Sequence, residues 1–142
     1  MKEYSHHALI AFLGGLLAAG GLFLLSYVVF DLAHIPKPFP ATPIGIFLHL
    51  LILVALIEEG AKFLLIRRGI GKYPYGYLLG FGFGISEALL TYPISEVWRG
   101  TGSTLLHIVT VGIIAYFIMK KRPGLGLAIA IVIHLGYDYL VM

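Results

Sequence analysis

The sequence predicts an all-α fold, a polytopic membrane helix bundle with about five transmembrane helices. Hydrophobic residues make up 59% of the 142-residue chain, and charged residues make up only 12%. That charged share is about half of what a soluble domain carries. The apolar residues also form runs of the roughly 20 residues that cross a bilayer. We therefore expect a single transmembrane domain over residues 1–142, and exclude a soluble globular protein, a disordered chain and a nucleic-acid binder.

Five apolar segments are predicted to span the membrane, and helix-terminating residues mark several of their limits. Thr42 and Pro43 are typical of an N-cap and a first helical residue. Pro93 closes the third segment and Pro123 opens the fifth. The first segment is longer than the apolar region of a signal peptide and has no small-x-small cleavage site, so we expect it to be retained. The predicted spans are residues 8–30, 43–66, 74–92, 103–119 and 123–141.

Basic residues in two short loops predict the orientation. The loop between spans two and three and the loop between spans four and five lie on the same side of a five-span protein. Both are basic, carrying Arg67, Arg68 and Lys72, and Lys120, Lys121 and Arg122, respectively. Because basic loops stay in the cytoplasm, we expect a cytoplasmic N-terminus, with the loops 31–42 and 93–102 and the C-terminus outside. The expected location is a prokaryotic plasma membrane.

Seven ionisable side chains lie inside the predicted spans, where each costs on the order of 3 kcal/mol on insertion scales. Counted along the helices, they fall within the middle band of a hydrocarbon core of about 30 Å. His49 lies nearer to the outer end and is interpreted as structural. We therefore expect spans two to five to pack around one polar cavity lined by Glu58, Glu59, Lys62, Glu87, His107, His134 and Asp138.

Helical spacing brings some of these residues together on one face. Lys62 follows Glu58 and Glu59 by one turn and can pair with either carboxylate. His134 and Asp138 are four residues apart and share a face. Rows of small residues, which allow close helix approach in lipid, accompany them: Gly76, Gly80, Gly84 and Ala88 in span three, and Gly126 and Ala130 leading to His134 and Asp138 in span five.

The residue types restrict the chemistry of such a cavity. Four acids face one lysine and two histidines, so either some carboxylates hold protons or a metal ion balances the charge. The chain has no cysteine, which excludes a thiolate nucleophile or ligand. No HExxH helix and no GxSxG nucleophile is present. A carboxylate that activates water remains, with imidazoles that donate hydrogen bonds to an oxyanion.

The order of the polar motifs resembles a known family. Residues 58–62 match EExxK, residues 83–87 match FxxxE, and residues 134–138 match HxxxD, with His107 alone on the span between the last two motifs. In this order, on successive helices, the chain resembles the PrsW family of glutamic-type intramembrane proteases. That family belongs to the superfamily of CAAX proteases and bacteriocin-processing enzymes (CPBP). The resemblance covers residues 48–139.

The resemblance implies a glutamate-dependent intramembrane protease that cuts a membrane protein or peptide substrate in or near the bilayer. By motif match, Glu58 is the general base for water, and Glu59 and Lys62 orient it. Glu87 shares the water and stands where CAAX endopeptidases carry a histidine. His134 and Asp138 match the pair that stabilises the oxyanion, where the CAAX enzymes have histidine and asparagine; an aspartate donates a hydrogen bond only when protonated.

Alternatives to this interpretation stay open. A metal-free site is favoured because Lys62 would repel a cation; the alternative is a Zn²⁺ site with Glu58, Glu87, His107 and His134 as ligands. Buried carboxylates and imidazoles also serve proton- or ion-coupled carriers. A third possibility is a non-catalytic membrane scaffold or binding protein of the same fold. The expected partners are a membrane-associated substrate and the lipid bilayer, with no nucleic acid, and the oligomeric state is left open.

Overall fold

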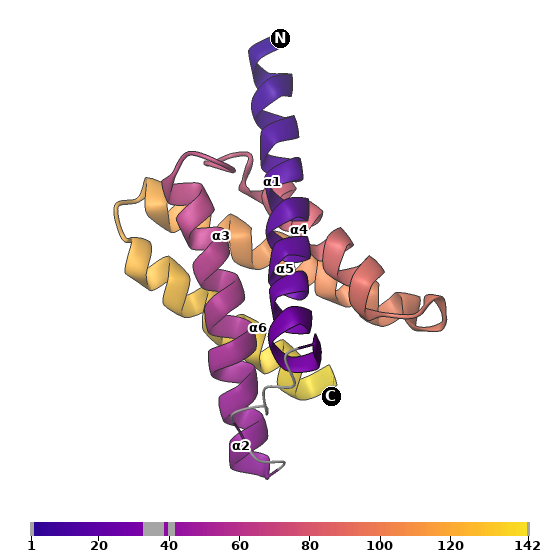
Figure 1. Cartoon of the computed structure of the whole chain (residues 1–142). Coiled ribbons are helices and arrows are strands. Elements are labelled where there is room, and N and C mark those ends of the chain that lie inside the picture. The colour runs from indigo at the N-terminus through magenta and orange to yellow at the C-terminus, as the bar shows by residue number, and fades with distance from the viewer. Residues whose placement is uncertain (1, 33–38, 40–41, 142) are drawn as a thin grey trace.

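A computed structural model of the chain describes residues 2–32, 39 and 42–141. Within these residues all regular structure is helical (Figure 1). This confirms the predicted all-α helix bundle. The short elements η1 and η2 are π-helical, and η3 is a 3-10 turn. In chain order the elements are α1 (Lys2–Ser26), η1 (Tyr27–Leu32), α2 (Pro43–Leu48), η2 (His49–Leu56), α3 (Ile57–Arg67), α4 (Gly76–Thr91), η3 (Ile94–Glu96), α5 (Val97–Met119) and α6 (Pro123–Val141).

Four helical segments are long and apolar enough to cross a bilayer: Ser5–Phe30, Pro43–Arg67, Ile94–Met119 and Pro123–Val141. They fit a multi-pass membrane protein. The predicted third span corresponds to α4, which has only 16 residues. A helix of that length rises about 24 Å, less than the hydrocarbon core of about 30 Å. Four of the five predicted spans therefore correspond to helical segments of full length, whereas the third corresponds to a shorter apolar helix.

The predicted helix limits hold at the second span and fail at the fourth. Thr42 Oγ1 accepts a hydrogen bond from the Gly45 backbone nitrogen at 3.1 Å, as an N-cap does. However, α5 begins at Val97, so the prediction of a loop over residues 93–102 is wrong. The polar residues there are accommodated within the helix, since the Thr101 hydroxyl donates to the Val97 carbonyl at 2.8 Å. The predicted loop 31–42 falls largely outside the described residues.

Glycines allow α4 to pack tightly between α1 and α5. A Cβ atom added to Gly80 would overlap the backbone of His107, and one added to Gly84 would overlap the backbone of Thr104. On another face of α4, a Cβ at Gly82 would overlap the Phe12 carbonyl of α1. The predicted row of small residues in this segment is thus a packing surface. It fixes the position of α4, and with it Glu87, against α5.

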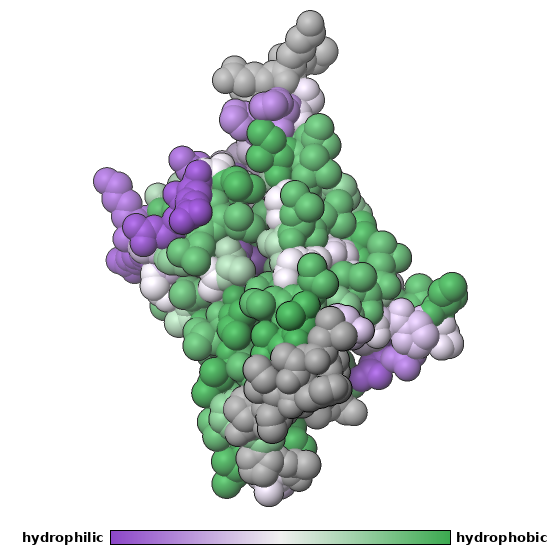
Figure 2. All heavy atoms as spheres, viewed as in Figure 1, coloured by the Kyte–Doolittle hydropathy of each residue, from purple (hydrophilic) through white to green (hydrophobic). Residues whose placement is uncertain are grey.

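The two basic loops lie at the same end of the bundle. In Figure 1 the connection from α3 to α4 and the turn from α5 to α6 are on the same side, and Figure 2 shows hydrophilic residues gathered there. The rings of Tyr73 and Tyr116, from the α3–α4 connection and from the end of α5, are 6.4 Å apart. Most of the remaining face in Figure 2 is hydrophobic, as expected of a surface that contacts lipid.

Candidate functional site

The polar side chains of α3, α4, α5 and α6 meet in one cluster inside the bundle. On α3, a turn of helix places Glu59 and Lys62 on the buried face, and both are fully buried. His107 of α5 is also fully buried, and His134 of α6 is 2% exposed. Buried charged residues require partners, because water no longer solvates them. These residues form hydrogen bonds and ion pairs with one another.

Lys62 links α3 to α5. Its Nζ atom donates to Oε1 of Glu59 at 2.6 Å and to Nδ1 of His107 at 2.6 Å, and it lies 4.2 Å from the centre of the Phe83 ring. An ammonium group has donors but no acceptor. Nδ1 of His107 is therefore an acceptor, and the neutral ring carries its proton on Nε2.

That proton is directed toward α4. Nε2 of His107 donates to Oε2 of Glu87. The same carboxylate oxygen accepts a hydrogen bond from the Ser103 hydroxyl at 2.8 Å, and Ser103 is 1% exposed. Two donors from α5 therefore bind the same oxygen of Glu87. They fix the orientation of this carboxylate.

His134 connects α6 to the cluster through both ring nitrogens. Nδ1 donates to Oε1 of Glu59 at 2.6 Å. Nε2 lies 3.4 Å from Oδ2 of Asp138 and 3.9 Å from Oε2 of Glu58. Thr110 of α5 also donates to Oε1 of Glu59, at 3.3 Å. Glu59 thus ties α3, α5 and α6 together, while the second nitrogen of His134 faces two further carboxylates.

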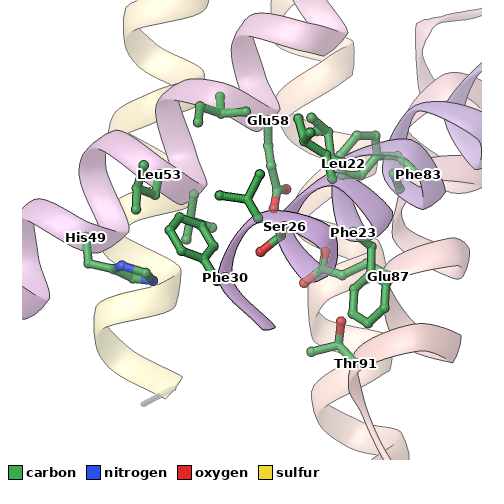
Figure 3. A pocket seen from close by; sticks show the side chains of 15 residues that line it. Leu22, Phe23, Ser26, Phe30, His49, Leu53, Glu58, Phe83, Glu87 and Thr91 are labelled. Atoms are coloured by element: carbon green, nitrogen blue, oxygen red, sulfur yellow. The ribbon is translucent and has the colours of Figure 1, made fainter. Parts of the chain in front are cut away.

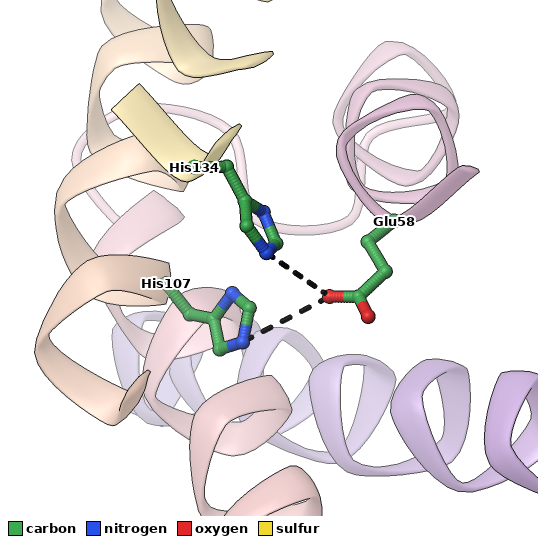
Figure 4. Close-up of side chains that lie close together, drawn as sticks. All are labelled: Glu58, His107 and His134. Atoms are coloured by element: carbon green, nitrogen blue, oxygen red, sulfur yellow. Dashed lines mark ion pairs between the residues drawn. The ribbon is translucent and has the colours of Figure 1, made fainter. Parts of the chain in front are cut away.

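Glu58 faces both imidazoles of the cluster (Figure 4). Its Oε2 atom lies 3.9 Å from Nε2 of His107, from Nε2 of His134 and from Nζ of Lys62. These distances are too long for direct hydrogen bonds. Among the described residues, this buried oxygen has no hydrogen-bond partner. The carboxylate oxygen therefore has three nitrogen atoms nearby but is hydrogen-bonded to none of them.

Glu58 also lines an apolar cavity of about 530 Å³ (Figure 3). Glu58 and Glu87 belong both to its wall and to the polar cluster. His49, which the sequence places away from the polar band, also lines the cavity. The lining residues come from α1, η1, η2, α3 and α4: Ala19, Leu22, Phe23, Leu25, Ser26, Val29, Phe30, His49, Leu53, Val54, Ile57, Glu58, Phe83, Glu87 and Thr91.

The structure brings all seven predicted site residues into this cluster. Three further members were not predicted: Ser103 and Thr110, which bind the carboxylates, and Phe83, which covers Lys62. The helical repeat contained a signal for each of them. Ser103 and Thr110 lie four residues before and three residues after His107, and Phe83 lies four residues before Glu87, so each shares a helix face with a predicted residue.

Three residues of the cluster are close enough together to bind one metal ion. Glu58, His107 and His134 each offer a ligand atom, and the three atoms lie within 4.8 Å of one another, a donor set that suits zinc. The hydrogen bonds of His107 oppose such an ion. Metal binding at Nε2 would displace Glu87 and would leave the proton on Nδ1, directed at the Lys62 ammonium. The cluster therefore fits a metal-free water site better than a zinc site.

Comparisons of the chain with family models, with curated proteins and with solved structures found no match. The resemblance to PrsW proteases therefore stays a prediction that depends on the motifs alone. The cluster and the cavity beside it belong to a bundle whose four long apolar helices fit a membrane protein.

Proposed function

We propose that the protein is an intramembrane endopeptidase that hydrolyses a peptide bond of a membrane-associated protein or peptide, with Glu58 activating water. One observation carries this proposal. The Oε2 atom of Glu58 is buried without a hydrogen-bond partner among the described residues, faces two imidazoles, and belongs to a residue that also lines an apolar cavity. A carboxylate in this position has a polar cluster on one side and space for a substrate on the other.

In the proposed reaction, Glu58 accepts a proton from water while the water oxygen attacks the carbonyl carbon of the substrate. The carbon–oxygen bond forms, and the carbonyl oxygen becomes an oxyanion. Collapse of this intermediate breaks the carbon–nitrogen bond, and Glu58 returns its proton to the leaving nitrogen. The products are a carboxylic acid and an amine, so the atoms of one water molecule are divided between them.

His134 is the proposed donor to the oxyanion. Nδ1 of His134 is hydrogen-bonded to Glu59. The orientation of the His134 ring is therefore fixed before the reaction begins. When the ring carries a second proton, Nε2–H is directed to the space between Glu58 and Asp138. Preorganised donors of this kind stabilise developing negative charge most strongly where water is excluded. Glu87, fixed by His107 and Ser103, positions the water from the opposite side.

The test is hydrolysis in ¹⁸O-labelled water. The purified protein is reconstituted in liposomes with single-span peptides of varied sequence, and the products are identified by mass spectrometry. We expect new C-termini that carry one ¹⁸O atom, and a loss of at least about 10³-fold in the Glu58→Gln variant, as removal of a general base allows. Glu96→Gln is the matched control, since Glu96 is 39% exposed and pairs with Arg99 outside the cluster.

Two results would contradict the proposal: fragments without ¹⁸O, or equal hydrolysis by wild type and Glu58→Gln. Absence of any hydrolysis across the peptide set would favour the non-catalytic scaffold instead.

One observation supports a second candidate, a proton-coupled carrier. A continuous series of close contacts runs from Glu87 through His107, Lys62, Glu59 and His134 to Asp138. Such connected titratable groups are used as proton relays in membranes. Acidification of the lumen of proteoliposomes that contain a trapped pH indicator would support this candidate, and Glu59→Gln should abolish the signal. No response to an imposed pH gradient would exclude it.

A further inference from the structure

The cavity beside Glu58 has a distinct distribution of polar and apolar groups. Its walls are largely aliphatic and aromatic, with Phe23, Phe30 and Phe83 among the lining residues. Two carboxylates, Glu58 and Glu87, belong to the wall that adjoins the polar cluster (Figure 3). A volume of about 530 Å³ lies within the range of sites that hold organic ligands. An occupant must therefore be apolar over most of its surface and polar beside the carboxylates.

The cavity exists because two neighbouring segments stay apart. α1 packs along α4, whereas contacts between α1 and η2 are few among the described residues. Several lining side chains are partly exposed, with exposed fractions of 44% for Phe23, 59% for Leu25 and 43% for Ile57. These residues lie on segments long and apolar enough to be surrounded by lipid. An opening between such segments would face the bilayer.

The carboxylates distinguish between the occupants that a bilayer can supply. The acyl chains of a phospholipid have no hydrogen-bond donor for Glu58 or Glu87, whose ionised carboxylates only accept hydrogen bonds. A polypeptide instead presents backbone N–H groups, which carboxylates accept. Ser26 and Thr91, whose hydroxyls both donate and accept, are also part of the wall. A peptide backbone can form hydrogen bonds with these polar groups. The large apolar side chains of the peptide can pack against the aromatic and aliphatic walls.

We propose that this cavity is a lateral binding site for the bulky apolar side chains of a membrane-embedded polypeptide, next to the bond that Glu58 attacks. This inference rests on the proposed function and names its substrate class: segments with large aliphatic or aromatic residues beside the scissile bond. Leu53 of η2 and Val29 of η1 form part of the walls. They are specificity-determining residues, because they limit the size of the side chain that enters.

The experiment measures binding separately from hydrolysis. A 22-residue leucine–alanine peptide with a central photoactivatable leucine is reconstituted with the full-length protein, and the labelled residues are located by mass spectrometry. We expect labelling of cavity residues in the wild type and at least about a tenfold decrease in Leu53→Trp, whose ring narrows the cavity. Ile52→Trp is the matched control in the same π-helical segment, since Ile52 is 38% exposed and does not line the cavity.

Val29→Trp, on the facing wall, is the second variant, and the elution profile and thermal transition of each variant establish that it folds. Equal labelling in Leu53→Trp, Val29→Trp and the control Ile52→Trp would overturn the inference. So would labelling of the cavity by a photoactivatable phospholipid but not by the peptide. Cavity labelling without ¹⁸O incorporation would contradict the proposed function alone, whereas hydrolysis with labelling outside the cavity would contradict this inference alone.

Discussion

Glu59 accepts a hydrogen bond from His134 across the contact between α3 and α6, with 2.6 Å between Oε1 and Nδ1. The same oxygen accepts hydrogen bonds from Lys62 and, at 3.3 Å, from Thr110 of α5. One carboxylate oxygen therefore holds two neighbouring helices in register with α3. Glu58, the preceding residue, lies 3.9 Å from His107, His134 and Lys62, so the position of the proposed base depends on the bonds of Glu59.

Glu59→Gln should destabilise the folded protein by about 3–5 kcal/mol, the effect of removing one partner of a buried ion pair. The substitution leaves the Lys62 ammonium fully buried without its closest counter-charge. Equilibrium unfolding in detergent micelles measures the change. The double variant Glu59→Gln/Lys62→Met should recover part of the loss, since it removes both charges. A double variant that is less stable than either single variant would contradict this account of the pair.

Gly80→Ala should destabilise the α4–α5 packing by about 1–3 kcal/mol, as overpacking of a filled interior does. Its Cβ atom would overlap the backbone carbonyl of His107, so hydrolysis should decline as well. Gly112→Ala on α5 is the matched control, because nothing lies within 4 Å of its Cβ position. There alanine should stabilise the helix by up to about 1 kcal/mol. Equal thermal transitions for the two variants would show that α4 is not packed as described.

Ser103→Ala should lower the rate of hydrolysis several-fold without preventing folding. The variant removes a donor to Glu87 but retains the one from His107, so the carboxylate keeps one of its two hydrogen bonds. Rates on the peptide identified by ¹⁸O labelling provide the measurement. Thr101→Ala is the control, since this exposed hydroxyl donates to the Val97 carbonyl of its own helix. A similar loss in both variants would indicate a general effect on α5.

Much of this fold was predictable because membrane helices are constrained by simple rules. Hydropathy located the helical segments, Thr42 indicated the start of the second span, and the spacing of Gly80 and Gly84 indicated a packing surface. The start of α5 was not predictable in this way. The segment from residue 97 to 102 is polar enough to suggest a loop, but its side chains bond within the helix or reach the surface, a choice that hydropathy does not encode.

The residues of the site were predictable, whereas their pairing was not. Ionisable groups in apolar spans are expected to gather at a common depth, and helical spacing allowed Lys62 to pair with either Glu58 or Glu59. The structure pairs Lys62 with Glu59 and with His107, and leaves Glu58 at 3.9 Å. That choice depends on how α5 is rotated against α3. The sequence predicted a polar cavity among spans two to five, whereas the cavity beside the cluster is apolar, is lined partly by α1, and contains Glu58 and Glu87 among the predicted residues. It arises from the separation of α1 and η2 rather than from any motif.

The wild-type protein should hydrolyse its substrate in the presence of a zinc chelator and should not bind Zn²⁺ in the cluster. The reason is the hydrogen bond from Lys62 to Nδ1 of His107. This bond keeps the proton of the His107 ring on Nε2, the atom that would bind the metal. Lys62→Met removes that ammonium and should raise the affinity for Zn²⁺ at least about tenfold, measured by titration calorimetry. Loss of wild-type hydrolysis with chelator and its recovery with added Zn²⁺ would contradict the metal-free site. Equally weak Zn²⁺ binding in wild type and Lys62→Met would instead show that Lys62 is not what opposes the ion.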